Sequence, residues 1–227
     1  MERTIVVGDV HGCVDELRRL LKKCGHEPGD HLVLTGDLVA KGPDSQGVVQ
    51  LVREAGARAV MGNHDERVLR VRAVARGELP RPEKGINPDH QRVADELQPA
   101  DWAYLTALPL FLRLGPERPG DVDTALLHAG AVPGVALEDQ TREDLMTMRS
   151  IDAHGKATRR IEGRPWAAVW TGPERIIFGH DAVRGLQEYP LATGLDSGCV
   201  YGKKLTALIL PERRLVSVAA RRAYVAL

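Results

Sequence analysis

Five short apolar runs in this chain of 227 residues are each closely followed by a cluster of Gly, Asp, Asn or His residues. The runs and their clusters are residues 5–7 with 8–12, 32–34 with 36–37, 59–61 with 62–65, 126–127 with 128, and 176–178 with 179–180. Such runs predict buried strands, and each cluster then lies in the loop that leaves the carboxyl end of its strand. Because several loops converge at that edge in layered α/β folds, we expect the clusters to meet at one ligand site.

Helical patterns connect the first three runs. From Val14 to Leu21 apolar residues recur at helical spacing, and Gly25 follows as the expected C-cap. A second helix is expected over residues 45–55, with Gly56 as its stop. This β-α-β-α-β order predicts a sheet covered by helices, with right-handed crossovers.

The remainder of the chain is less regular. Residues 66–77 look helical, residues 79–89 are broken by Pro and Gly, and two short helical patterns run through Tyr104. We predict that residues 66–107 form a helical insertion beside the site, within a single domain of residues 1–227. Residues 111–114 and 123–127 are expected to pair as strands, and Thr141 to cap a short helix ending near Arg149. The tail, roughly residues 194–218, is expected to form a meander in a second sheet.

The balance of charge argues against some partners. Lys and Arg number 31, as do Asp and Glu, so there is no net charge to attract duplex nucleic acid or an anionic membrane. No run approaches the roughly 18 apolar residues that a membrane span needs. The three cysteines form neither a CxxC pair nor an even disulfide set, and this favours a reducing cytoplasm.

The five clusters supply carboxylate, amide and imidazole groups, which suit hard or borderline divalent ions. The candidate ligands are Asp9, His11, Asp37, Asn63, His128 and His180. Turn chemistry explains any single cluster equally well, since Asp, Asn and Gly favour turns. Five clusters at the same end of five strands favour a metal site. If the site holds a pair of ions, it needs a carboxylate that both ions share, and the clusters contain aspartates that could serve.

The order of the motifs resembles that of the calcineurin-like phosphoesterases and, within them, the phosphoprotein phosphatase superfamily. The motifs are GDVHG at 8–12, GDLV at 36–39, GNHD at 62–65, HAG at 128–130 and FGH at 178–180. Two longer stretches, LTGDLVAKGP at 34–43 and LDSGCVYG at 195–202, are similar to bacterial symmetrical diadenosine tetraphosphate hydrolases and the ApaH-like phosphatases. The resemblance implies an α/β fold in which two mixed β-sheets pack face to face and are flanked by helices.

The resemblance also implies two divalent ions held by the six candidate ligands: Asp9 and His11 on one ion, Asn63, His128 and His180 on the other, and Asp37 as the bridge. It implies that a hydroxide shared by both ions attacks phosphorus directly. Manganese is the expected metal, and Fe, Zn, Co and Mg suit the same ligands.

Further residues near these motifs have implied roles in catalysis and phosphate binding. His64 is the implied general acid, which protonates the leaving oxygen. Asp65 either holds that histidine or caps the following helix. Lys41 and Arg149 are implied to bind the substrate phosphate, with Asn63 keeping the site cationic enough for it.

Other polar and aromatic residues have two interpretations each. Lys156, Arg159, Arg160 and Arg164 either meet a second phosphate or form a solvated face. Trp166 and Trp170 either stack a base or pack in the core, and their spacing favours the core. Cys13 and Cys199 have no companion base and are expected to pack.

The resemblance implies a phosphohydrolase that splits diadenosine tetraphosphate symmetrically into two ADP. The alternative is a small protein phosphatase acting on Ser, Thr or Tyr, alone or alongside that activity. Ala40 disfavours it, because the family's protein phosphatases have Asp there and Arg at the position of Lys41. Hydrolysis of capped RNA is a further chemical neighbour. A decayed scaffold that only binds a partner is the remaining alternative, and intact ligands argue against it.

Overall fold

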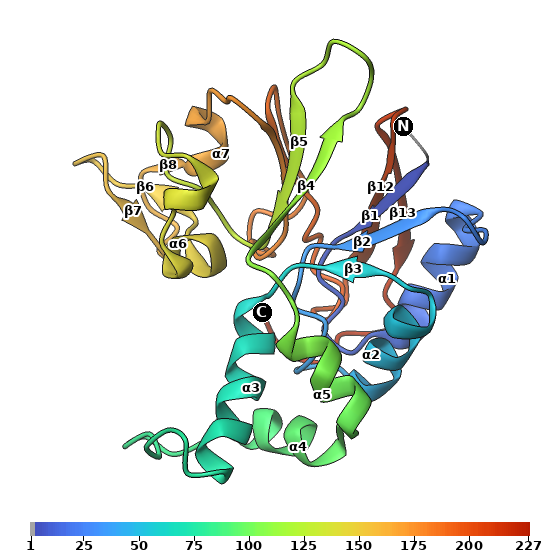
Figure 1. The fold of residues 1–227 in the computed structure, drawn as a ribbon, viewed down its shortest axis with the longest axis vertical. Coiled ribbons are helices and arrows are strands. Elements are labelled where there is room, and N and C mark those ends of the chain that lie inside the picture. Colours follow the sequence, from blue (N-terminus) through green and yellow to red (C-terminus); the bar gives the residue numbers. More distant parts are fainter. Residues whose placement is uncertain (1–2) are drawn as a thin grey trace.

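The computed structural model describes residues 3–227 and contains two five-stranded mixed sheets that pack face to face (Figure 1). The first sheet has the strand order β13-β12-β1-β2-β3, and the second has the order β10-β11-β9-β5-β4. The first sheet consists of β1 Thr4–Val7, β2 His31–Leu34, β3 Arg58–Ala59, β12 Lys204–Leu210 and β13 Arg214–Ala219. The second consists of β4 Phe111–Pro116, β5 Asp123–Leu127, β9 Arg175–Phe178, β10 Gln187–Tyr189 and β11 Ala192–Gly194. The predicted α/β class with two mixed sheets is confirmed.

The runs 5–7 in β1 and 176–178 in β9 are apolar at every position and are buried on both faces of their strands. In β1, Ile5 and Val7 pack in a core shared with helices, whereas Val6 lies between the two sheets. In β9, Ile177 also lies between the sheets, and Phe178 faces the opposite side. Successive side chains of a strand point to opposite faces, so each of these strands contributes to two cores.

Helices cover the outer face of each sheet (Figure 1). On the first sheet these are α1 Val14–Cys24 and α2 Ser45–Glu54, followed by α3 Asn63–Ala75, α4 Pro88–Glu96 and α5 Pro99–Thr106. On the second are η1 Leu137–Asp139, α6 Arg142–Thr147, α7 Trp166–Val169 and a small sheet of β6 Ser150–Ile151, β7 Ala157–Thr158 and β8 Arg164–Pro165. None of the helices within residues 3–227 combines the length and apolar character that crossing a membrane requires.

The first half of the chain follows the prediction closely. Strands β1, β2 and β3 are parallel neighbours connected by α1 and α2. Helix α1 ends at Gly25, whose φ of 65° lies in the left-handed region that a C-cap glycine adopts. Strands β4 and β5 pair antiparallel, and the Thr141 hydroxyl accepts from the Asp144 N–H at the start of α6.

The prediction for the tail was wrong about its sheet. Strand β12 pairs antiparallel with β1, so the β12–β13 hairpin extends the first sheet, and only the end of β11 overlaps the expected segment in the second. The physical reason is that β12 is buried from Leu205 to Leu210 and therefore needs cover on both faces. A position beside β1, between α1 and the second sheet, provides that cover.

Two further features differ from the expectation. Helix α3 begins at Asn63, three residues before the predicted start, because the Asp65 carboxylate accepts from the Gly62 N–H and caps the first turn. The small sheet of β6, β7 and β8 was not predicted, since its strands are only two residues long. The single-domain organisation with residues 66–107 as an insertion stays a prediction.

Candidate metal and phosphate site

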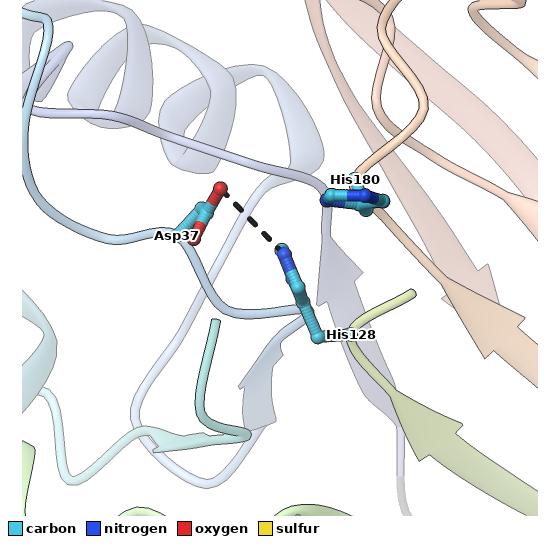
Figure 2. A group of neighbouring side chains, drawn as sticks. All are labelled: Asp37, His128 and His180. Carbon is cyan, nitrogen blue, oxygen red and sulfur yellow. Dashed lines mark ion pairs between the residues drawn. The ribbon is translucent and has the colours of Figure 1, made fainter. Parts of the chain in front are cut away.

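The polar clusters meet where the carboxyl ends of strands from both sheets come together. The loops or helix starts after β1, β2 and β3 contribute from the first sheet, and the loops after β5 and β9 from the second. Two groups of ligand-type atoms result, Asp9, His11 and Asp37 in one and Asp37, His128 and His180 in the other, and in each group the atoms lie within 4.8 Å of one another. Figure 2 shows the second group, with the His128 ring directed at the Asp37 carboxylate. Asp37 belongs to both groups.

One oxygen of Asp37 lies between the groups. Asp37 Oδ2 is 3.3 Å from His11 Nε2 and 3.6 Å from His128 Nε2. Asn63 Oδ1 lies 3.1 Å from the same His128 nitrogen, so the amide joins the second group. The other carboxylate oxygen, Asp37 Oδ1, accepts from the His64 N–H at 2.8 Å. The carboxylate is therefore fixed by the start of α3 and presents its free oxygen to both groups.

Each imidazole is oriented by its second nitrogen. His11 Nδ1 donates to Val39 O at 3.2 Å, and His128 Nδ1 donates to Thr35 O at 2.8 Å, so both present Nε2 as an acceptor. His180 Nε2 is buried and has no hydrogen-bond partner among residues 3–227. A buried nitrogen without a partner is costly unless something binds it, and a metal ion is a suitable group.

Burial alters the pKa values of these groups. It lowers the pKa of His11 to about 4 and that of His180 well below its usual value, so both imidazoles are uncharged. It raises the pKa of Asp9, which the charges of Asp196 and Asp37 raise further. Burial acts in the same direction on Asp37, but neighbouring histidines outweigh it and hold the pKa of that carboxyl well below its usual range. Uncharged imidazole nitrogens and the ionised Asp37 carboxylate suit divalent ions, and a bound cation would also favour the ionised form of Asp9.

The backbone is strained where the ligands lie. Of the six non-glycine residues with positive φ among residues 3–227, five belong to this site: His11, Asp37, Ala40, Lys41 and His180. Such conformations cost free energy and cluster where a side chain must be held in a required direction. The φ values of 47° at His11, 48° at Asp37 and 68° at His180 place three candidate ligands in this class.

Gly179 allows the sheets to approach each other at the site. A Cβ atom at this position would collide with Asp9 Oδ1. The neighbouring His180 N–H donates to Asp9 Oδ2 at 2.9 Å, which links the loop after β9 to the loop after β1. Only glycine permits so close an approach of the two loops.

His64 projects from the first turn of α3 toward α4. Its Nδ1 lies 3.0 Å from His90 Nε2, and its ring stands 5.1 Å from that of His11. His90 is buried at 7% exposure, and the sequence interpretation gave it no role. The preceding Asn87-Pro88 pair signals a helix start, with the Asn87 side chain accepting from the His90 N–H, but no local pattern shows that α4 packs on α3.

Of the two interpretations of Asp65, the hydrogen bonds of the described residues match the helix cap and include none to the His64 ring. Asp65 is fully buried and accepts from the N–H groups of Gly62, Leu38 and Val39 at 3.0, 2.9 and 3.2 Å. Burial, with a further contribution from Asp37, raises the pKa of Asp65 to about 8. Among residues 3–227, the hydrogen bonds of Asp65 therefore cap α3 and fix the loop that follows Asp37, and His90 occupies the place beside His64.

The candidate phosphate-binding residues line one cavity of about 200 Å³ together with His11, Asn63 and His64. Lys41 Nζ donates to the Tyr201 hydroxyl at 2.8 Å and to His11 Nε2 at 3.2 Å. His11 Nε2 also faces Asp37 within the first group of ligand-type atoms, so a metal ion and Lys41 would compete for this nitrogen. Arg149 lies on the opposite loop, where its Nη2 donates to His180 O at 3.3 Å.

Asp196 is a site residue that the sequence interpretation did not single out, although it lies within the LDSGCVYG stretch. It is 5% exposed, lines the same cavity, and burial raises its pKa to about 6. Its Oδ1 accepts from the Gly198 N–H at 3.1 Å. The proximity of this carboxyl to Asp9 increases the negative charge that a bound cation must balance.

The remaining candidates separate clearly. Of the predicted basic patch, Arg159 lines the cavity, whereas Lys156, Arg160 and Arg164 are not among its lining residues. Trp166 and Trp170 are 2% and 5% exposed and belong to the core of the second sheet, as their spacing favoured. Cys13, Cys24 and Cys199 are buried free thiols.

Comparisons with known proteins agree with the motif order. A family model described as calcineurin-like phosphoesterase matches residues 2–189. A symmetrical bis(5'-nucleosyl)-tetraphosphatase of Edwardsiella ictaluri is 32% identical over 97% of both chains, and an asymmetrical one, PrpE of Oceanobacillus iheyensis, is 29% identical over 97% of this chain and 94% of its own. Serine/threonine-protein phosphatase 1 of Salmonella typhimurium is 28% identical over 88% of both chains. A crystal structure assigned to a diadenosine tetraphosphatase has a TM-score of 0.83 and 38% identity, covering 96% of this chain and 94% of that one.

Proposed function

Because the chain belongs to the calcineurin-like phosphoesterase family and is therefore a metal-dependent phosphohydrolase, we propose that it cleaves diadenosine tetraphosphate symmetrically into two ADP. One observation carries the proposed chemistry: a single oxygen of Asp37 faces both groups of ligand-type side chains. A shared carboxylate is what a pair of metal ions requires. The names of the similar tetraphosphatases support the substrate, and symmetrical cleavage is the more specific part of the proposal.

We assign the six candidate ligands to two divalent ions, preferably Mn²⁺: Asp9 and His11 to one, Asn63, His128 and His180 to the other, and Asp37 to both. When bound, such ions polarise phosphoryl oxygens and activate water. The chain itself orients the donors, through the bonds of His11 to Val39 and of His128 to Thr35. Lys41 and Arg149 line the cavity from opposite loops, and we assign the binding of the substrate phosphate to them.

Metal binding is expected to stabilise the fold. The site contains three buried carboxyls, Asp9, Asp37 and Asp196, and a buried imidazole nitrogen of His180 without a partner. When the free ion concentration is 100 times Kd, each bound ion adds about 2.7 kcal/mol to the free energy of unfolding. For a chain of this size, that raises Tm by roughly 5–10 °C per ion. Thermal unfolding of chelator-treated protein with and without added MnCl₂ measures this shift. Equal Tm values in both samples would contradict the assignment.

We infer that His64 gives a proton to the leaving oxygen and that His90 positions it. In the acid form both nitrogens of His64 carry protons, and Nδ1 donates to His90 Nε2. That bond fixes the ring, so the Nε2 proton remains available to the substrate in the cavity that His64 lines. His90 thus provides the support that the family's protein phosphatases obtain from the Asp that Ala40 replaces.

His90→Ala is expected to lower kcat for phenyl phosphate by about tenfold to a hundredfold, because a loosely held acid is misplaced. The effect on p-nitrophenyl phosphate, whose leaving group departs as an anion, is expected to be smaller, and KM should change little for either ester. His90→Gln, which keeps a side-chain acceptor, should recover part of the loss. Exposed His154→Ala is the matched control. Equal losses on both esters would instead indicate a purely structural role.

Turnover of diadenosine tetraphosphate, a phosphoserine peptide and a phosphotyrosine peptide under one set of conditions tests the substrate. We expect the dinucleotide to have the highest kcat/KM and ADP to be its sole nucleotide product. ATP and AMP together would contradict symmetrical cleavage. A clear preference for a phosphopeptide would favour the second candidate, a protein phosphatase, which the Salmonella typhimurium relative supports.

A further inference from the structure

A second cavity, of about 460 Å³, lies beside the catalytic one. It is formed by one face of α3 and by the chain between α3 and α4, which projects from the helical end of the molecule (Figure 1). Its apolar wall contains Val71 and Val74 on α3 and Leu79 and Ile86 on the connecting chain. No role in the proposed reaction has been assigned to this cavity.

The two cavities are adjacent at the acid side of the site. Arg67, one helical turn beyond His64, lines both of them. His90 forms part of the wall of the second cavity, and its Nε2 is the partner of His64 Nδ1. The second cavity therefore adjoins the catalytic cavity next to His64, the residue proposed to protonate the leaving group.

The cavity combines cationic and apolar surfaces. Arg67 and Arg70 are exposed, and neither forms a hydrogen bond or ion pair within the described residues 3–227. Unpaired guanidinium groups bind phosphate in two-pronged fashion and stack on the faces of aromatic rings. Beside them, Val71, Val74 and Ile86 offer the apolar contact that a flat base requires.

We propose that this cavity holds the nucleoside of the leaving nucleotide and that Arg67 and Arg70 bind the phosphates between it and the metal site. This inference rests on the proposed function. The dimensions agree with it, because Val71 lies seven residues after His64 and therefore about 10 Å further along the helix, which is comparable to the reach of a diphosphate and a ribose. An anionic chain that ends in a flat apolar group matches the order of cations and apolar side chains along α3.

Inhibition of p-nitrophenyl phosphate hydrolysis by ADP and by pyrophosphate tests the cavity without requiring dinucleotide turnover. In the unmodified enzyme, ADP is expected to bind roughly tenfold more tightly than pyrophosphate, because only ADP fills the apolar part. In Ile86→Glu this difference should disappear, and in Arg67→Gln both inhibitors should weaken. Val122→Glu introduces the same charge at an apolar residue that is 43% exposed on the β4–β5 hairpin and should preserve the difference.

The same variants separate this inference from the proposed function. If diadenosine tetraphosphate is a substrate, Ile86→Glu should raise its KM about tenfold more than that of p-nitrophenyl phosphate. Suppose that diadenosine tetraphosphate is turned over, that Ile86→Glu changes the KM values of both substrates equally, and that this variant still prefers ADP to pyrophosphate. The cavity assignment would then be wrong, and the proposed function would stand. No dinucleotide turnover would contradict the function, and the ADP comparison would still decide the cavity. If Ile86→Glu impairs only phosphopeptide turnover, the cavity binds peptide and the inference is wrong.

Discussion

Asp37→Asn is expected to lower kcat/KM for every phosphate ester and anhydride by roughly a thousandfold or more, because each ion supplies several kcal/mol of transition-state stabilisation. The substitution keeps the size of the side chain and the acceptor for the His64 N–H, but removes the negative charge between His11 and His128. Both ions should bind less tightly. Metal content measured after dialysis should therefore fall along with activity, and the Mn²⁺-induced rise in Tm should shrink.

Asp121→Asn is the matched control, since Asp121 is exposed in the turn between β4 and β5. It should retain the activity, metal content and Tm of the unmodified enzyme. Circular dichroism verifies that both variants are folded. If Asp37→Asn binds as much metal as the unmodified protein and hydrolyses its substrates at a similar rate, Asp37 does not bridge two ions.

His64→Ala is expected to have the second-largest effect, and its size should depend on the leaving group. An alkyl or phenyl ester needs a proton on its leaving oxygen, so its kcat should fall by about a hundredfold to a thousandfold. p-Nitrophenolate and ADP depart readily as anions, so their esters and anhydrides should lose much less. Metal content should persist, because the candidate ligand Asn63 and the Asp37 carboxylate are unchanged.

A plot of log kcat against leaving-group pKa, for a series of aryl phosphates, measures this dependence. The slope should be steeper in His64→Ala than in the unmodified enzyme, with His90→Ala intermediate. Parallel lines would mean that His64 acts in binding or metal placement and would remove its role as an acid.

The part of the fold that could be predicted lies in the strands and in the residues that follow them. Residues such as Val6 and Ile177 belong to runs that are apolar at every position, and such runs indicate strands with two buried faces. Because β1 and β2 are parallel neighbours, their carboxyl ends share an edge, and this brought Asp9 and Asp37 together. The same reasoning applies to His128 and His180, which follow β5 and β9, two strands that the structure shows to be parallel neighbours in the second sheet.

Long-range pairing could not be predicted in the same way. The β12–β13 hairpin joins β1 through hydrogen bonds between segments about 200 residues apart, and nothing in its own sequence distinguishes one sheet from the other. His90 was missed for the same reason: its partner His64 is reached through the packing of α4 on α3. The sequence around Asp65 fits both a contact with His64 and a helix cap. The N–H groups of Leu38 and Val39, which lie on a distant loop, hold the carboxylate in the capping position.

The most direct measurement is a crystal structure of the protein grown with excess MnCl₂, with anomalous diffraction data used to locate the metal. We expect two anomalous peaks, one in contact with Asp9 and His11, the other with Asn63, His128 and His180, and the Asp37 carboxylate in contact with both. A single peak, or two peaks that Asp37 does not contact together, would show that this carboxylate does not bridge two metal ions.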